Sequence, residues 1–473
     1  MAGYIEDRWV NKRVSKKTGK RERTERYGKG KRYKVDGIPG VKPAFFDNLK
    51  DAEKWKAKAI TKIGEGTWID PRAGDVTLRE YVEKTWWPSL RVPPTTKESM
   101  KSRVFNHILP HAGSLPLNRI GDEEIRAWVV RAEQDLDVSS IRVAWRHFSQ
   151  IMQAATTGKR IPANPFREPD LKAPSVPKSK AKAWPRETVA AVREGIGARY
   201  RILVDEAVGG GLRQGETFGL SLDDIDGDVI HVVRQVIKVG GKLAFAPPKG
   251  NKERDAPCPA RLAAAIDAHA AEFPSVNVTL PWVDPARPNL PWDERPLRTV
   301  RLLVTTTHTD CAGGGAVNRT TFDEAHWKPA LVRAGVISEP KVEYVQAKGK
   351  KPWRKVVWDM DREDGFHVLR HTFSSVVLQS GETIQKLAAW LGHSDPAFTY
   401  RTYAHFLPDS GNRAMATLGD WVGAAPDVLA TGGGEDAIGE RVALLAVLAE
   451  ILENEREPEQ LRSRLSALLS PVS

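Results

Sequence analysis

The chain has 473 residues and an apolar share of 41%, so it is long enough for about three domains and too apolar to be wholly disordered. Its longest uninterrupted apolar run, Val442 to Ala449, is far shorter than the ~18 residues of a membrane-spanning helix, and its first twenty residues are polar and basic, unlike a secretory signal. Lys and Arg total 72 against 60 Asp and Glu, and this net charge of +12 favours a polyanionic partner. Cys258 and Cys311 fit neither a disulfide framework nor a zinc site, so we expect free thiols in a reducing cytoplasm.

Residues 1–70 are predicted to form a small β-rich unit with one helix. Stretches around Tyr4–Val10 and Lys31–Val35 have strand character, and Asn48 or Asp47 can cap a helix that runs to Ile63. Residues 1–34 hold 13 basic and 4 acidic side chains, a net charge of +9, interleaved with Tyr and Trp. Disordered basic tails rarely carry so many aromatic residues, so we expect a folded unit that binds a polyanion. The basic residues expected to contact DNA here are Lys12, Arg13, Lys16, Lys17, Arg21 and Arg23.

Residues 76–170 are predicted to form a second, all-helical unit. Apolar residues recur at helical spacing near its start, and another helix is expected over about Ser139 to Ala155. In the segment that follows, residues 171–185, prolines alternate with lysines and large apolar residues are almost absent. This composition is typical of an extended, semi-rigid linker. The linker lysines expected to lie along DNA phosphates are Lys178, Lys180 and Lys182.

Residues 186–420 are predicted to form a third unit of mixed α and β structure that is mainly helical. The glycines 209–211 should break a helix over Tyr200–Val208, and a hairpin should follow, with strands Val229–Lys238 and Lys242–Pro247. The later helices are expected near Phe322–Ala334, Phe366–Gln379 and Glu382–Leu391.

Two further segments differ in composition from the rest. Residues 275–360 are rich in Pro, Trp and Lys, and we interpret them as a peripheral insertion with no assigned chemistry. Residues 421–473 hold 4 basic and 9 acidic side chains, a net charge of −5, and are predicted to form two amphipathic helices split by Pro458. Because short helices cannot bury apolar stripes alone, this tail is expected to dock on a protein surface.

Strongly polar residues interrupt the apolar helical patterns of the third unit. His367 and Arg370 are three residues apart, hence one turn apart on the same side of a predicted helix, and His393 follows a helix end directly. Arg213 follows three glycines, which allow close approach of the backbone to a ligand. Two arginines, two histidines, a lysine in a hairpin turn and a nearby tyrosine suit one task, which is to grip a phosphate and move a proton.

Five sequence blocks carry these residues in a fixed order: Gly211-Leu-Arg-Gln-Gly-Glu, Pro-Pro-Lys249, Phe-His367-Val-Leu-Arg370-His-Thr, Leu-Gly-His393-Ser and Thr-Tyr403-Ala-His. The ordered set resembles the tyrosine recombinase family, the phage-type integrases. The resemblance spans about residues 185–410, the catalytic unit. More loosely, residues 1–70 look like the arm-binding domain of that family and residues 76–170 like its core-binding domain. The resemblance therefore implies a multidomain protein with a small β-rich N-terminal domain, an all-α domain and a mixed α+β catalytic domain that is mainly helical.

Two of the implied roles leave a choice of residue. The resemblance implies that Tyr403 attacks a scissile DNA phosphate, forming a 3′-phosphotyrosyl bond and releasing a 5′-hydroxyl, and the Tyr-Ala-His-Phe context favours it over Tyr400. Lys249 would protonate the leaving 5′-oxygen, and the Pro-Pro-Lys context favours it over Lys242 and Lys252.

The other implied roles concern the phosphate itself. Arg213 and Arg370 would hold its non-bridging oxygens, His367 would serve as acid and base, and His393 would hydrogen-bond the phosphate. Glu216 is expected to orient Arg213 or a neighbouring histidine. The covalent link stores the phosphodiester energy, so neither a cofactor nor a metal is expected. The histidines interpreted as structural neighbours are His371 and His405.

The resemblance implies a site-specific recombinase that inserts and excises a phage genome or another mobile element. Its implied partners are double-stranded DNA attachment sites, three further copies of the chain in a synaptic homotetramer, a DNA-bending host factor and a directionality factor, with no membrane. Its implied location is the bacterial cytoplasm, at the nucleoid. Residues 436–470 of the tail are expected to pack on a catalytic domain of the same or an adjacent copy.

Three rivals remain. A chromosome-resolving recombinase of the same family usually lacks an arm-binding unit, which residues 1–70 provide. A type IB topoisomerase shares the chemistry but fits the Leu-Gly-His block and the small domains poorly. A catalytically silent DNA-binding protein is disfavoured because the set of catalytic residues is intact.

Overall fold

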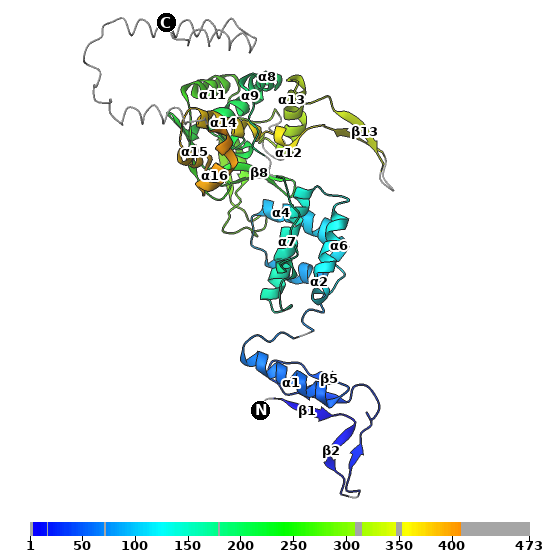
Figure 1. Cartoon of the computed structure of the whole chain (residues 1–473). Helices are drawn as coiled ribbons and strands as arrows, with labels where there is room; N and C mark the ends of the chain where they lie inside the picture. The colour runs from blue at the N-terminus through cyan, green and yellow to red at the C-terminus, as the bar shows by residue number, and fades with distance from the viewer. Residues whose placement is uncertain are drawn as a thin grey trace, which may run out of the picture. The chain divides into compact units, whose positions relative to one another are not determined.

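The computed structural model describes residues 3–16, 18–70, 72–177, 180–307, 315–346 and 352–407 (Figure 1). The predictions for the acidic tail, for Cys311 and for the phosphate contacts of Lys17 and Lys178 lie outside the described residues. Within these ranges, no helix is both long and apolar enough to cross a membrane.

The N-terminal unit is a three-stranded antiparallel sheet covered by one helix. The sheet has the order β1 (Tyr4–Asp7), β4 (Tyr33–Asp36), β5 (Ala44–Phe46), and α1 (Leu49–Gly64) packs on β4 and β5. The side chain of Asn48 accepts a hydrogen bond from the Asp51 amide and so caps α1. A separate two-stranded ribbon, β2 (Val10–Val14) and β3 (Arg21–Arg23), carries the basic loop at its tip. The small core gathers around Val35, Ile38, Ala52, Ala59, Trp55 and Trp68.

The second unit is all-helical, with α2 (Leu78–Tyr81), α3 (Trp87–Ser89), α4 (Pro94–Arg103), α5 (Leu109–Ala112), α6 (Asp122–Ala132) and α7 (Val138–Thr157). Its core surrounds the apolar face of α7, where Phe148 meets Trp128 edge to face at a ring-centroid distance of 5.4 Å. Asp137 caps α7 by accepting a hydrogen bond from the Ser140 amide.

Within the described ranges, three helices widen into a π turn shortly before a proline. The π turns cover Val82–Trp86, Val104–Ile108 and Asp323–Trp327. In each case the second residue after the turn is a proline: Pro88, Pro110 or Pro329. Proline has no amide hydrogen and its ring presses on the preceding turn, so a wider turn lets the helix continue past it.

The third unit has the largest core, with α9 (Ala198–Gly209) at its centre. This helix contacts α8 (Arg186–Gly195), α10 (Gln214–Thr217), α11 (Ala260–Glu272) and α14 (Val368–Gln379). The remaining helices are α12 (Arg319–Phe322), α13 (Lys328–Arg333), α15 (Ile384–Leu391) and α16 (Pro396–Tyr403). Short antiparallel sheets complete the unit: β6 (Ile225–Asp226), β7 (Val229–Val232) and β10 (Arg254–Pro257) form one, and β8 (Gln235–Val239) with β9 (Lys242–Ala246) forms a hairpin.

The predicted strand Val229–Lys238 is wrong as a single element. It is split into β7 and β8, which belong to different sheets. Between them Arg234 turns inward and forms an ion pair with the buried carboxylate of Asp224. The apolar alternation continues across this break, and for that reason the sequence pattern alone does not show it.

The interpretation of residues 275–360 as a peripheral insertion is also wrong for most of that segment. The strands β11 (Val276–Pro281) and β12 (Leu297–Leu302) pair with each other, and their residues Val278, Leu280 and Leu302 are fully buried in the main core. Trp327 stacks on Trp184 at a centroid distance of 5.9 Å. The peripheral part is the ribbon β13 (Lys341–Val345) and β14 (Trp353–Val357), which Figure 1 shows projecting from the unit.

Candidate active site

The side chain of Glu216 is the buried centre of the site. It lies in α10, which begins three residues after Gly211. Its carboxylate accepts hydrogen bonds from Arg213 Nη1 at 2.9 Å and from Arg254 Nη1 and Nη2 at 2.9 and 2.6 Å. It also accepts one from the backbone amide of Arg213 at 2.8 Å. One carboxylate therefore fixes two guanidinium groups, of which Arg254 comes from β10, 38 residues along the chain.

The arginines keep Glu216 ionised despite its burial. Burial alone would raise the pKa of the carboxyl group, but the hydrogen bonds from Arg254 and the positive charges of Arg254, Arg213 and Arg370 outweigh it and lower the pKa to about 2.

Arg370 lies in α14, and its side chain is almost completely buried, with 1% exposed. It donates hydrogen bonds to the carbonyl oxygens of Gly211 and Leu391. Burial, together with the positive charges of Arg213 and Arg254, lowers its pKa below the ordinary value of an arginine. These hydrogen bonds hold the guanidinium group beside Arg213 before any DNA is bound.

The C-terminal end of α15 offers acceptors to all three arginines. Leu391 O accepts from Arg370 and from Arg213 Nη2, the latter at 3.2 Å, and Trp390 O accepts from Arg254 Nε at 2.7 Å. The last carbonyl groups of a helix have no partners within the helix and carry partial negative charge. They therefore suit guanidinium donors.

Two glycines make this close packing possible. Gly392, with φ +65°, ends α15 in the left-handed region, and a Cβ there would lie 2.6 Å from Arg254 Cδ. Gly211, with φ +66°, would place a Cβ 2.6 Å from a ring carbon of Phe373. Any other residue at these positions would push apart the elements that carry the arginines.

Tyr403 is the last residue of α16, and only 2% of its side chain is exposed. Its hydroxyl group forms a 2.9 Å hydrogen bond with His371 Nδ1. Burial raises the pKa of Tyr403, while a hydrogen bond with Ser374 and the charges of Arg370 and Arg213 act in the opposite direction. Tyr400, the alternative, is 57% exposed, and no hydrogen bond to the described residues of this cluster of charges is seen for it.

Three histidines surround the arginines and the tyrosine. His367 is an exposed residue directly before the first residue of α14, and its ring centroid lies 4.6 Å from that of His371. His393 follows Gly392 and pairs with Thr399 Oγ1 at 2.8 Å. Loss of solvent, and then the nearby positive charges, lower the pKa of His367 and bring those of His371 and His393 to about 4. All three rings are therefore neutral at pH 7 and can accept a proton.

Lys249 lies in the exposed turn between β9 and β10, and not in the β8–β9 hairpin turn where the sequence pattern had suggested a lysine. Its positive charge contributes to the lowered pKa of both His367 and His393, so it belongs to the same electrostatic neighbourhood. Of the alternatives, Lys242 lies over the ring of Trp292, 5.6 Å from its centroid, and Lys252 is exposed two residues before β10 begins.

The sequence pattern missed two residues of the cluster. Arg254 is a charged residue on the inward face of a strand, alternating with buried Ala256, and this alternation is the signal that could have identified it. His371 had been interpreted as a structural neighbour, yet it contacts the tyrosine hydroxyl directly. His405, the other such histidine, contacts the linker carbonyl of Ala181.

The predicted DNA-contacting residues lie elsewhere. Lys182 forms a 2.6 Å ion pair with the buried Asp364, so it tethers the linker to the third unit. The described N-terminal residues of the set are exposed on β2, β3 and the loop between them: Lys12, Arg13, Lys16, Arg21 and Arg23. These regions are not part of the cluster around Glu216.

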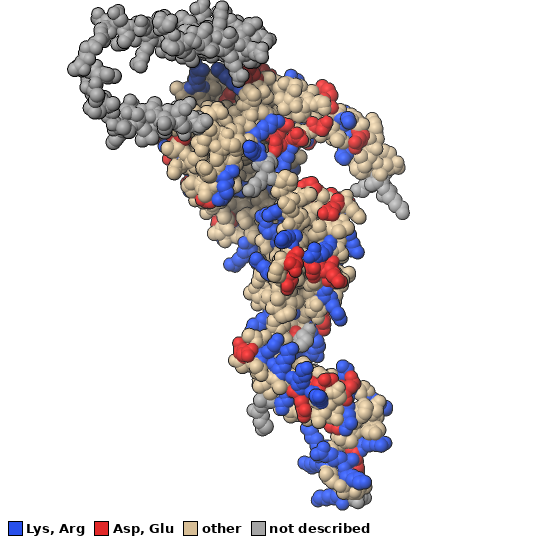
Figure 2. All heavy atoms as spheres, in the orientation of Figure 1, with Lys and Arg blue, Asp and Glu red and all other residues tan. Residues whose placement is uncertain are grey.

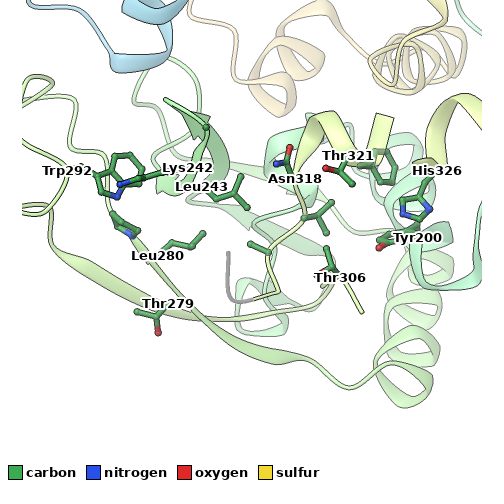
Figure 3. A pocket seen from close by; sticks show the side chains of 15 residues that line it. Tyr200, Lys242, Leu243, Thr279, Leu280, Trp292, Thr306, Asn318, Thr321 and His326 are labelled. Atoms are coloured by element: carbon green, nitrogen blue, oxygen red, sulfur yellow. The ribbon is translucent and has the colours of Figure 1, made fainter. Parts of the chain in front are cut away.

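The third unit also contains a cavity of about 690 Å³ that is separate from this cluster (Figure 3). Its wall includes Tyr200, Asn318 and His326, and the rings of Tyr200 and His326 lie 4.2 Å apart. The described residues that line it include none of the predicted catalytic residues.

No protein-family model matches the chain. The chain is 24% identical over 399 residues to a tyrosine recombinase XerC-like protein of Caldanaerobacter subterraneus, an alignment that covers 80% of this chain and 92% of the relative. It is 26% identical over 291 residues to a protein of Mycobacterium tuberculosis named as a prophage phiRv2 integrase, over 55% of this chain and 76% of that one.

Among solved structures, the Tn1549 transposon integrase in complex with circular intermediate DNA has a similar fold. The TM-score is 0.54 at 17% identity, and the alignment covers 72% of this chain and 99% of the integrase fragment. The sequence relatives span most of this chain, and the fold agrees with them. The chain is therefore similar to relatives named as tyrosine recombinases and integrases, site-specific recombinases that cut and rejoin DNA.

Proposed function

We propose that this recombinase integrates and excises a phage or another mobile element through a covalent bond between Tyr403 and DNA. The proposed covalent chemistry is supported by the position of the Tyr403 hydroxyl group. It lies beside His371, within a cluster of guanidinium groups held by Glu216. A buried nucleophile next to neutral histidines and fixed positive charge suits attack on a phosphodiester.

In the proposed first step, Tyr403 Oη forms a bond to the scissile phosphorus, and the bond from phosphorus to the 5′-oxygen breaks. The tyrosine proton passes to a neutral histidine, for which His367 is the candidate, because its ring is partly open to solvent and packs on His371. His371 holds the hydroxyl group in place beforehand. The leaving 5′-oxygen takes a proton from Lys249.

Arg213 and Arg370 are proposed to bind the non-bridging oxygens, with His393 as a further donor. Each of the two guanidinium groups donates a hydrogen bond to Leu391 O, so its position is fixed before DNA binds. Because the groups need not reorganise during the reaction, their charge stabilises the transition state more effectively than that of mobile side chains.

Rejoining reverses the same steps with the 5′-hydroxyl of another strand. Since one phosphodiester bond is exchanged for one phosphotyrosyl ester and back, the reaction consumes no external energy. Exchanging all strands of two duplexes requires four such tyrosines, which supports a homotetramer as the working assembly.

Integration, rather than chromosome resolution, is proposed because of the N-terminal unit. Figure 2 shows Lys and Arg side chains gathered over the end of the chain that holds β2 and β3. Several of these cations lie over aromatic rings, for example Arg23 over Tyr27 at 4.0 Å and Lys12 over Tyr4 at 4.9 Å. A folded, basic ribbon of this kind suits a second DNA segment, separate from the one cut by the catalytic unit.

The nucleophile can be tested by removing a single oxygen atom. Tyr403→Phe should leave folding and DNA binding intact while covalent adduct formation on nicked suicide DNA falls by at least about a thousandfold. Tyr400→Phe, the matched control on the same helix, should form the adduct normally. Loss of the adduct in Tyr400→Phe with retention in Tyr403→Phe would show that the wrong tyrosine was chosen.

The role of Lys249 can be tested by changing the leaving group. Lys249→Ala should slow cleavage of ordinary DNA about a hundredfold or more, the usual contribution of a general acid. In DNA with sulfur in place of the bridging 5′-oxygen, the leaving group is a thiolate, which needs no proton. The cleavage rate of this DNA should therefore be nearly the same for wild type and variant. Lys242→Ala and Lys252→Ala serve as controls, and a rate defect of Lys249→Ala that persists on the sulfur substrate would contradict the assignment.

The N-terminal unit can be tested by truncation. A chain that starts near residue 75 should still bind and cleave a core site but lose integration, and the full chain should show the steeper salt dependence of DNA affinity, since it neutralises more phosphates. The measurements are gel-shift affinities over a salt series and an integration assay between two plasmids. Normal integration by the truncated chain would exclude this role.

A further inference from the structure

The ribbon formed by β13 and β14 has no covering layer in the part of the chain that the structure describes. Its strands pair in antiparallel register from Lys341 opposite Val357 to Val345 opposite Trp353, and Figure 1 shows it standing off the catalytic unit near α13. All strand residues except Val345 and Val357 are exposed. A two-stranded hairpin alone is marginally stable in water, so this ribbon gains stability when another surface covers it.

One face of the ribbon combines apolar, aromatic and cationic side chains. Residues that alternate along a strand share a face, and the register places Val342 opposite Val356 and Tyr344 opposite Arg354 on the same face. Tyr344 is 77% exposed, and both valines are exposed as well. A contiguous exposed patch of this kind marks an interaction surface.

The charge of the ribbon favours a polyanion. Its described strands carry Lys341, Arg354 and Lys355 against one acidic residue, Glu343. In the sequence, residues 346–352 between the strands add three lysines and no acidic residue, so residues 341–357 carry a net charge of +5. Both strands are also edge strands, and lysines or arginines on an edge disfavour pairing with a strand of another protein molecule.

The root of the ribbon is anchored to the catalytic unit. Trp358, directly after β14, donates a 2.8 Å hydrogen bond from Nε1 to Glu324 Oε2. Lys328 Nζ lies 5.6 Å from the centroid of the Trp358 ring. These contacts to the π turn and α13 hold the base of the ribbon on the body that carries the active site.

We propose that the β13–β14 ribbon binds duplex DNA beside the segment held in the active site, with its Tyr344 and Arg354 face in the major groove. This groove admits a two-stranded β-ribbon, and arginine donors and apolar groups contact base edges there. The proposal rests on the proposed function, since it assumes that the catalytic unit holds DNA. It gives the chain a DNA contact within the catalytic unit in addition to the active site and the basic N-terminal unit.

The test uses the full-length chain and duplexes that this chain selects from a random-sequence pool. The double variant Tyr344→Ser with Arg354→Gln should shorten the hydroxyl-radical footprint at one end of each bound segment and keep its centre. Affinity for long duplexes should fall about tenfold, the size of one base-edge contact, whereas affinity for duplexes trimmed to the central segment should not change. Arg261→Gln, which removes an exposed arginine from α11, is the matched control for charge.

A photocrosslinking amino acid in place of Tyr344 identifies the partner directly. Crosslinks to DNA bases outside the central segment are expected. An unchanged footprint, or crosslinks to another copy of the chain in place of DNA, would overturn the proposal. Cleavage of suicide DNA is measured on the same samples. If the ribbon variant still cleaves but its footprint is unchanged, only the ribbon proposal fails. If the wild-type protein cleaves none of the selected DNA, the proposed function is contradicted.

Discussion

The active site depends on one buried carboxylate, that of Glu216. Three guanidinium groups lie close together in the interior, and without a negative charge among them their mutual repulsion and loss of hydration would oppose folding. Glu216 neutralises part of this charge and contacts Arg213 and Arg254 directly. At the end of α15, Leu391 O accepts hydrogen bonds from Arg370 and Arg213, and the second hydrogen bond of Arg370 goes to Gly211 O, between α9 and α10. Elements distant in sequence are thereby tied to one point.

This arrangement leaves a surplus of positive charge. One carboxylate faces three guanidinium groups, and the histidines around them are neutral at pH 7 because burial and these same charges lower their pKa values. A phosphodiester carries the single negative charge that such a site lacks. The same charges that favour phosphate binding also keep the histidines free to accept a proton, so binding and proton transfer have a common electrostatic origin.

The sequence predicted the site residues that are unusual in their immediate sequence context. Arg213 after three glycines, Arg370 inside an apolar helix and His393 after a helix-ending glycine are each unusual in their immediate surroundings, and the structure brings them together with Tyr403. Partners fixed only by tertiary folding were not predictable in this way. Arg254 meets Glu216 across 38 residues of chain, and the proximity of His371 to Tyr403 depends on how α14 and α16 meet.

The errors in the predicted fold have the same origin. At the break between β7 and β8, Arg234 forms an ion pair with Asp224, a tertiary contact that no periodicity reveals. Residues 276–302 were assigned to the periphery because they are rich in Pro and Trp, although their strands supply part of the main core. Composition describes a segment on its own, whereas burial depends on what the segment packs against.

The most direct test of the central role of Glu216 is the free energy of unfolding of the Glu216→Gln variant, measured by urea denaturation with tryptophan fluorescence. Because the pKa of Glu216 is about 2 in the folded chain against an ordinary 4.5, its ionised form stabilises the fold fully above pH 4.5, and this contribution is lost as the pH falls toward 2. We expect the variant to lose about 3 kcal/mol at pH 7 relative to wild type, and less at pH 3, while Glu194→Gln, which breaks only exposed ion pairs, changes stability by less than about 0.5 kcal/mol. Equal stability of Glu216→Gln and wild type at pH 7 would contradict the account.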